Sequence, residues 1–279
     1  MRLTPEQIKG RVKNVARENG ADARTLMRIY MMERFLERVS VSPYRDNFII
    51  KGGILVTAMV GVAHRSTMDI DTSIRNHNLS AEDAKRIISE IKDINLDDGI
   101  VFEIKKVSGI MDEMEYPGIR IGMDAYVGGL VTPMTIDIST GDIITPRAVE
   151  YKYKLLLDNR SICLWSYNLE TILAEKIQTV LARGLLNTRM RDFYDIYTLL
   201  SIYEQEIDTQ IFKCAFAATC RKRKTEKLAN DALQIIETIN ADEHLQSLWK
   251  SYQKKYPYAA NISYDDVIKC SKALCSQLC

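Results

Sequence analysis

The stretch Arg65-Ser66-Thr67-Met68-Asp69-Ile70-Asp71 places two carboxylates two residues apart beside apolar residues. Side chains alternate between the two faces of a β-strand, so Asp69 and Asp71 are predicted to share a face, about 7 Å apart. Asp137 has a similar setting in Thr135-Ile136-Asp137-Ile138. If its strand lies beside the first, about 4.8 Å away, three carboxylates converge. The pattern predicts that all three bind Mg²⁺, which would support phosphoryl or nucleotidyl transfer.

A glycine pair, Gly52-Gly53, precedes this stretch and opens a predicted helix that runs through Val60. Glycine allows close approach of the backbone to a ligand, and a helix N-terminus offers free N–H groups and a positive dipole end, which suits a triphosphate. Alone, the pair also fits a plain tight turn, and an isolated D-x-D is more often a solvated strand face or a backbone cap. The order of glycine pair, D-x-D and Asp137 favours a site. Arg65 is predicted to pair with a phosphate or with the carboxylates.

Lys176 lies on or beside the apolar stripe of a predicted helix over 168–184, whereas Glu175 is predicted to face solvent. Two interpretations stay open for the lysine. Its stem could lie along the apolar surface with the ammonium in water, or the ammonium could point inward and bind a triphosphate.

Asp192 and Asp195 are three residues apart on the next predicted helix, with Arg189 and Arg191 as local cationic neighbours. They fit a ladder of ion pairs on a helix surface. They also border a predicted buried face, and a buried carboxylate beside a cation is usually a structural pair or part of a site.

Composition sets limits on the function. Among 279 residues the net charge is +1, so any nucleic-acid binding must come from a local patch, for which the basic run 213–227 is the densest candidate. Six cysteines without a C-x-x-C pair and three histidines argue against zinc. No apolar run reaches the roughly 20 residues that span a bilayer, and the N-terminus lacks the apolar core of a signal peptide. We therefore expect a cytoplasmic protein with no membrane contact.

The periodicity predicts an α+β fold with an α/β domain over 1–165, which includes two N-terminal helices in 1–40, and a helical domain over 166–279. Gly128-Gly129 indicates a hairpin between two strands. The expected strands cover 48–50, 68–74, 100–107, 119–126 and 130–138, with strand character ending near 163–165. The expected later helices cover 80–92, 168–184, 189–204, 208–221, 225–240, 241–255 and 264–276.

Four motifs in this order resemble the AbiEii family of nucleotidyltransferase toxins, from type IV toxin–antitoxin and abortive infection systems. They are Gly52-Gly53, Arg65-x-Thr67-x-Asp69-Ile70-Asp71, Ala174-Glu175-Lys176 and Arg189-x-Arg191-Asp192-x-x-Asp195, within about residues 48 to 200. The resemblance implies a bilobed protein, in which a DNA polymerase β-like mixed-sheet lobe and a helical-bundle lobe enclose an active cleft. It also implies a nucleoside triphosphate substrate, Mg²⁺ and a separate antitoxin encoded nearby. Some members add nucleotides to the 3′ end of tRNA and so block translation.

The resemblance also implies roles for individual residues. Asp69 and Asp71 would hold metal and triphosphate, the nucleotide would contact Gly52, Gly53, Arg65, Thr67 and Lys176, and Asp192 or Asp195 would complete the catalytic site. Two departures stand out: Arg191 replaces a lysine common in the family, and members differ over whether a third acid such as Asp137 is used.

The sequence thus predicts a Mg²⁺-dependent nucleotidyltransferase toxin that transfers a nucleotide to RNA, with the tRNA 3′ end as the expected acceptor. Two alternatives stay open. One is a nucleotidyltransferase that modifies a small molecule such as an antibiotic. The other is a nucleotide-binding regulator without turnover.

Overall fold

The computed structural model describes residues 3–75, 79–110 and 118–278. The chain forms two compact units. The first comprises Met1–Asp142 together with Ala148–Ser166, and the second comprises Ile143–Arg147 together with Tyr167–Cys279. The first unit contains the β-sheet, and the second is built from helices.

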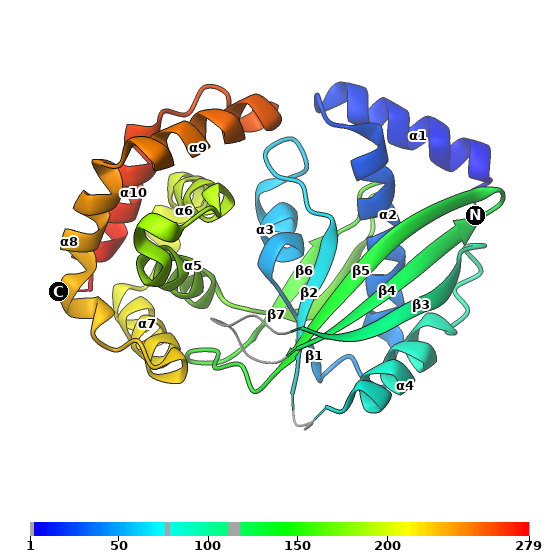
Figure 1. Ribbon diagram of the computed structural model, residues 1–279. Helices are drawn as coiled ribbons and strands as arrows, with labels where there is room; N and C mark the ends of the chain where they lie inside the picture. The colour runs from blue at the N-terminus through cyan, green and yellow to red at the C-terminus, as the bar shows by residue number, and fades with distance from the viewer. Residues whose placement is uncertain (1–2, 76–78, 111–117, 279) are drawn as a thin grey trace. The chain divides into compact units, whose positions relative to one another are not determined.

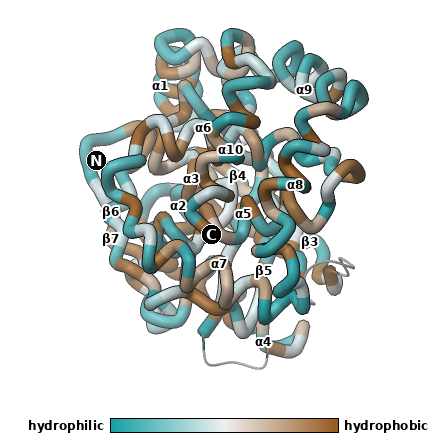
Figure 2. Tube along the Cα trace, turned by 90° about the vertical axis from the view of Figure 1, so that its left-hand side faces the viewer, coloured by the Kyte–Doolittle hydropathy of each residue, from teal (hydrophilic) through white to brown (hydrophobic). Residues whose placement is uncertain are grey.

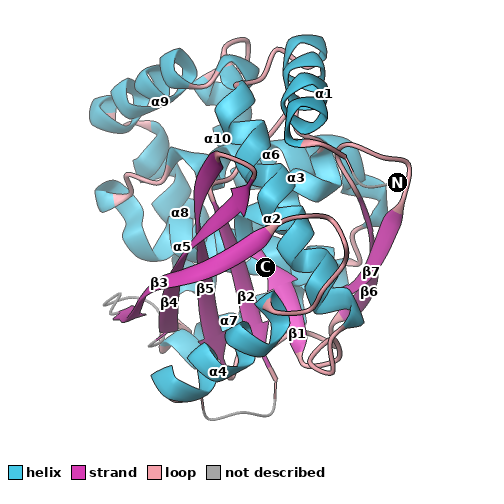
Figure 3. Ribbon diagram, turned by 90° about the vertical axis from the view of Figure 1, so that its right-hand side faces the viewer, coloured by secondary structure: helices cyan, strands magenta, loops and turns pink. Residues whose placement is uncertain are grey.

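The first unit is organised around a mixed seven-stranded sheet with the order β3-β4-β5-β2-β1-β7-β6 (Figures 1 and 3). The pairs β2–β5 and β1–β7 are parallel, and the other neighbours are antiparallel. The α+β mixed sheet predicted from the sequence is confirmed. The strands are β1 (Phe48–Lys51), β2 (Asp69–Ile74), β3 (Val101–Ile110), β4 (Gly118–Val127), β5 (Leu130–Thr140), β6 (Val149–Lys154) and β7 (Ser161–Ser166).

Helices α1 and α4 of this unit begin where the sequence places their caps. Thr4 and Gln7 form a capping box at the start of α1, and the Ser80 side chain accepts the Asp83 N–H at the start of α4. Helices α2 and α4 contact the sheet, and α3 contacts β1 and β2. The bounds are α1 (Pro5–Glu18), α2 (Ala23–Val41), α3 (Gly52–Val60) and α4 (Ala81–Lys92).

Strands β4 and β5 have one apolar and one polar face because their residues alternate. Ile121, Met123 and Ile136 are buried, whereas Arg120 and Asp137 point to the opposite face. The hairpin at Gly128-Gly129 is confirmed, since Val127 pairs with Leu130. This alternation directs the charged side chains of the central strands to a single face of the sheet.

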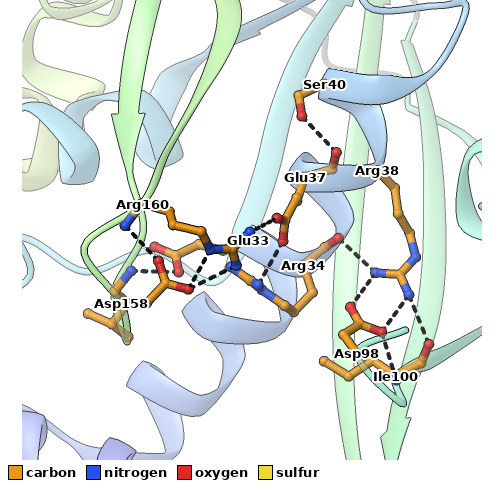
Figure 4. Close-up of polar contacts among 10 residues, drawn as sticks. Glu33, Arg34, Glu37, Arg38, Ser40, Asp98, Ile100, Asp158 and Arg160 are labelled. Carbon is orange, nitrogen blue, oxygen red and sulfur yellow. Dashed lines mark hydrogen bonds and ion pairs between the residues drawn. The ribbon is translucent and has the colours of Figure 1, made fainter. Parts of the chain in front are cut away.

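Ion pairs attach α2 to the segments at the ends of the strands (Figure 4). Both terminal nitrogens of Arg38 donate to Asp98, at 2.8 and 2.9 Å, and one also donates to the Ile100 carbonyl oxygen at 3.0 Å. In the β6–β7 turn, Arg160 donates to Glu37 of α2 at 2.5 Å. The bidentate, largely desolvated contact between Arg38 and Asp98 fixes orientation as well as adding energy.

The second unit is a helical assembly whose helices each bury one face. Figure 2 shows hydrophilic and hydrophobic stretches alternating along α9, which buries Leu245, Trp249 and Tyr252. The six α-helices among its described residues are α5 (Leu169–Arg183), α6 (Met190–Tyr203), α7 (Thr209–Arg223), α8 (Leu228–Asn240), α9 (Glu243–Lys255) and α10 (Tyr264–Ser276). They match the predicted helices to within a few residues.

Strand β6 is the element that the sequence did not single out. Its residues Val149–Lys154 lie at the edge of the sheet and pair only with β7 among the described strands. Charged side chains are common on edge strands because they discourage pairing with other chains, and they weaken the apolar signal of a strand. No helix in the described part of the chain is long and apolar enough to cross a membrane.

Candidate active site

The parallel pairing of β2 and β5 brings the three predicted carboxylates to one face of the sheet. Asp71 lies opposite Asp137, and Asp69 lies opposite Thr135. The strand of Asp137 therefore lies beside that of Asp69 and Asp71, as the sequence predicted. Because the side-chain period of a strand is two, this register puts all three carboxylates on the same side.

Burial makes the charged forms of these carboxylates costly. Desolvation raises the pKa of Asp69, and the nearby Asp137 raises it further. Desolvation also raises the pKa of Asp71, although the Gly53 N–H and the Lys51 ammonium act in the opposite direction. Partly buried carboxylates that repel one another are stabilised by a cation, which makes this face a candidate cation site.

Arg120 neutralises the third carboxylate. Its Nε and Nη2 atoms donate to the two oxygens of Asp137 at 2.7 and 2.6 Å, and this bidentate contact raises the pKa of Arg120. Among residues 3–75, 79–110 and 118–278, no group of three or more His, Cys, Asp and Glu side chains is placed to hold a metal ion. Asp69 and Asp71 nevertheless fit the donor set of Mg²⁺, which commonly takes one or two protein carboxylates together with waters and substrate phosphates.

The glycine turn before α3 is built against Asp71. The Gly53 N–H donates to Asp71 Oδ2 at 2.9 Å. A Cβ atom on Gly52 would lie 2.2 Å from the same oxygen, and Gly52 has a φ of +57°, which L-residues rarely adopt. Both constraints require glycine at position 52. The turn, the N-terminus of α3 and the Asp71 carboxylate are therefore packed directly against one another.

Arg65 and Thr67 lie beneath this turn. Both side chains are buried, and Arg65 donates to the Ser66 carbonyl oxygen while the Thr67 hydroxyl donates to the Asp69 carbonyl oxygen at 3.3 Å. A Cβ atom on Gly53 would lie 2.6 Å from Thr67 Oγ1 and 3.4 Å from an Arg65 nitrogen. In this position the two side chains support the turn, and the direct contact with the nucleotide that the resemblance implies for them stays a prediction.

Two cations at this face were missed by the sequence analysis. Lys51 lies opposite Asp71 in the β1–β2 pair, and its Nζ is 2.7 Å from Asp142 Oδ2. The other is Arg120, and a signal for it was present: the two-residue hairpin at Gly128-Gly129 fixes the register, and counting back along both strands puts Arg120 opposite Asp137.

Lys176, Asp192 and Asp195 come together within the second unit. The Lys176 ammonium donates to Asp192 Oδ1 at 3.0 Å and to Asp195 Oδ2 at 2.6 Å. The side chain of Asp195 is fully buried, that of Lys176 is 12% exposed and that of Asp192 is 15% exposed. The Lys176 ammonium therefore points inward, as one of the two interpretations expected. Asp195 is fully buried and so does not belong to a ladder of ion pairs on the helix surface.

The surroundings of this cluster correct two smaller expectations. Glu175 is half-buried, 3.9 Å from a guanidinium nitrogen of Arg223, and does not simply face solvent. Arg191 donates to the Tyr256 hydroxyl at 3.1 Å, and its guanidinium lies 5.7 Å from the centre of that ring. Glu175 and Arg191, which neighbour the cluster in sequence, are thus paired with α7 and with the segment after α9.

Taken together, a D-x-D strand beside a glycine turn and a helix N-terminus, on a mixed sheet, define a nucleotidyltransferase. The sequence model of the family described as "Nucleotidyl transferase AbiEii toxin, Type IV TA system" matches residues 34–270, and the chain belongs to this family. It is accordingly a nucleotidyltransferase toxin of a type IV toxin–antitoxin system, a class that implies a nucleotide substrate and an antitoxin partner. No curated protein matches the sequence.

Two solved structures are similar to this chain, and one of them supports the fold. The chain is similar to MenT4, a nucleotidyltransferase toxin from Mycobacterium tuberculosis H37Rv, with 14% identity, coverage of 96% of this chain and 98% of that chain, and a TM-score of 0.57. It is also similar to JHP933 from Helicobacter pylori, with 14% identity, coverage of 91% and 93%, and a TM-score of 0.48. At this identity the likeness to MenT4 supports the shared fold.

Proposed function

We propose that this toxin is Mg²⁺-dependent and transfers a nucleotide from a nucleoside triphosphate to the 3′ end of an RNA, with tRNA as the acceptor, and thereby blocks translation. The observation that carries the proposal is the contact between the Gly52-Gly53 turn and Asp71, with Asp69 on the same strand face. It places the N-terminus of α3, where a positive dipole end suits phosphate, beside carboxylates that suit a metal. We place this activity in the cytoplasm, where the acceptor and an antitoxin encoded nearby would meet it.

In this proposal Asp69 and Asp71 hold the metal, which would offset the charge of the phosphates and lower the pKa of the attacking hydroxyl. The acceptor oxygen forms a bond to the α-phosphorus, and the bond between that phosphorus and the bridging oxygen breaks, so that pyrophosphate leaves with the bonding electrons. The hydroxyl proton is lost to solvent. The protein mainly positions the two reactants and neutralises the negative charge of the phosphates, as in other phosphoryl transfers.

The remaining residues are given supporting roles. Gly52 and Gly53 would bring the helix N-terminus to the triphosphate, and Arg65 and Thr67 would hold the turn in place. Asp137 would be a third metal ligand if Arg120, which now pairs with it, contacted a phosphate instead. Charge-assisted contacts from guanidinium to phosphate are strong enough for such an exchange.

Lys176 is proposed to contact the triphosphate, following the family motif that contains it. Asp192 and Asp195 then act as positioning residues, since both accept hydrogen bonds from its ammonium. Three donors on one nitrogen allow Lys176 to keep one carboxylate while it donates to a phosphate.

The basic run of α7 supports a polyanionic acceptor. Arg223 is used structurally, since it donates to Gln178 at 2.5 Å and to Thr179 at 3.0 Å. Arg221, Lys224 and Lys227 are exposed and available for phosphate contact. Their contribution would weaken steeply with salt, as counterion release requires.

The test is transfer of each α-labelled nucleoside triphosphate, with Mg²⁺, onto total tRNA. Wild type is compared with Asp69→Ala and with the control Asp46→Ala, whose carboxylate is 77% exposed. Label on RNA with wild type and Asp46→Ala, but not with Asp69→Ala, supports the proposal. Equal labelling by all three contradicts the assigned site.

Two further measurements distinguish the alternative functions. Transfer to an aminoglycoside but not to tRNA would identify a small-molecule nucleotidyltransferase. Triphosphate binding in a calorimeter with no release of pyrophosphate on any acceptor would identify a nucleotide-binding regulator.

A further inference from the structure

A hollow of about 280 Å³ lies on the sheet face that carries Asp69. Thr135, one of its lining residues, is opposite Asp69 in the β2–β5 pair and opposite Gly122 in the β4–β5 pair. Pro133 and Asp124, also opposite one another, continue the lining along the same two strands. The hollow therefore begins one strand away from a proposed metal ligand, within the same compact unit.

Gly122 leaves the space open. Its backbone has no positive φ, and a Cβ atom there would meet only Lys106, at 3.9 Å or more, which is ordinary contact. Neither backbone strain nor crowding therefore requires glycine at this position, in contrast to Gly52. A glycine inside a strand weakens it and often marks a bulge or a place where a ligand comes close. The β3–β4 register does shift between Ile104 and Lys106, beside Gly122.

The walls suit a flat aromatic ring with polar edges. Met68 is 41% exposed, and its sulfur accepts a hydrogen bond from Arg28 Nη1 at 3.1 Å. Thioethers make favourable contacts with aromatic rings. The Nε of Arg28 is buried without a hydrogen-bond partner, and Asp124 supplies an acceptor 3.8 Å from Lys105 Nζ. The guanidinium of Arg28 and the carboxylate of Asp124 therefore put a hydrogen-bond donor group and an acceptor group among the lining residues.

We propose that this hollow is a nucleobase subsite of the transferase, a reading that rests on the proposed nucleotide transfer. Its volume is near the lower end of ligand pockets, which suits one ring system and excludes a whole nucleotide. Arg28 also lowers the pKa of Asp69 through its charge, so the subsite and the carboxylate are electrostatic neighbours. The base belongs either to the incoming triphosphate or to the terminal nucleotide of the acceptor, and the experiment separates these sources.

The decisive variant is Gly122→Val, which fills the hollow with a side chain that strands accept readily. Gly109→Val is the matched control, because Gly109 is also an extended glycine in an antiparallel strand and has no atom within 4 Å of its Cβ position. Met68→Ala is the second variant, since it removes an exposed wall without depending on strand packing. Circular dichroism and thermal melting establish that each variant is folded.

Three probes are titrated into the full chain with Mg²⁺: an α,β-methylene nucleoside triphosphate, inorganic tripolyphosphate and the trinucleotide CCA. If the hollow holds the base of the triphosphate, Gly122→Val raises the Kd of the nucleotide at least fivefold and leaves that of tripolyphosphate unchanged. If it holds the acceptor base, the Kd of CCA rises at least fivefold and that of the nucleotide is unchanged. Met68→Ala shifts the same probe in the same direction, and Gly109→Val shifts none.

The proposal is overturned if both base-containing probes change less than fivefold, if tripolyphosphate weakens as much as the nucleotide, or if wild type binds neither base-containing probe. The readout is binding, so it does not depend on turnover. A wild-type protein that transfers nothing to any acceptor would contradict the proposed function, whereas a base-specific loss of binding in Gly122→Val would still establish the subsite.

Discussion

Replacing Gly52 with alanine should separate backbone strain from displacement of Asp71, a proposed metal ligand. Gly52 has a φ of +57°, and a left-handed L-residue costs about 1–2 kcal/mol. The new methyl group would lie 2.2 Å from Asp71 Oδ2, whereas real Cβ atoms almost never come within 3.0 Å of another heavy atom. The carboxylate or the turn must therefore move by roughly 0.8 Å, a distance set by these two values.

A shift of that size affects the reaction more than it affects folding. It lengthens the 2.9 Å hydrogen bond from the Gly53 N–H to Asp71 and displaces a proposed metal ligand. Misplacement of a catalytic group by about 1 Å typically costs on the order of 100-fold in rate. We therefore expect Gly52→Ala to lower kcat about 100-fold and to destabilise the protein by about 1–2 kcal/mol or somewhat more.

Gly20→Ala is the matched control. Gly20 has a φ of +59°, but no atom lies within 4 Å of its Cβ position, so this variant carries the same backbone strain without the collision. Initial rates of labelled nucleotide transfer, at equal concentrations of folded protein, give kcat, and urea unfolding gives the stability. A Gly52→Ala rate within threefold of the Gly20→Ala rate would refute the link between the turn and Asp71.

The remaining predictions concern charge. Asp69→Asn should lower kcat at least ~1,000-fold because one metal ligand loses its charge; a loss below tenfold would contradict that role. Lys176→Met removes the cation that contacts fully buried Asp195 and should cost about 3 kcal/mol or more in urea unfolding; a cost below about 1 kcal/mol would argue against a tightly coupled pair. Burial raises the pKa of Glu33 from 4.5 to about 8, so between these values the folded state keeps a proton that the unfolded state loses. The free energy of unfolding should therefore fall as pH rises, by up to about 1.4 kcal/mol per unit, and Glu33→Gln, which has no proton to lose, should flatten that slope; parallel slopes would disprove the shift.

The sequence predicted the elements of this fold closely because its local signals agree with one another. The caps at Thr4 and Ser80 mark helix starts, and the hairpin at Gly128-Gly129 marks a strand reversal. Helices α5 to α10 have apolar residues at helical spacing. Edge strand β6 was missed because exposed charged residues interrupt its apolar pattern.

The candidate site was predicted in part. The sequence analysis expected the three carboxylates to converge if the strand of Asp137 lay beside that of Asp69 and Asp71, and β5 does pair with β2. The burial of Arg65 under the glycine turn and the bidentate contact between Arg120 and Asp137 were not foreseen. Both depend on which side chains fill the space next to the carboxylates, and sequence spacing does not report this.

The sequence by itself determined the residue chemistry and the order of secondary structure: a glycine turn, a D-x-D strand, a third acid, and a lysine and two acids on consecutive helices. Those features are local, since caps, turns and side-chain periodicity act over a few residues. Only the tertiary structure decided which charges are paired and which glycines leave room for a ligand. The sequence marks Gly52 as part of a glycine pair, but it does not report that Gly52 is held against Asp71 or that Gly122 lines a hollow, because the space around a glycine is set by residues distant in the chain.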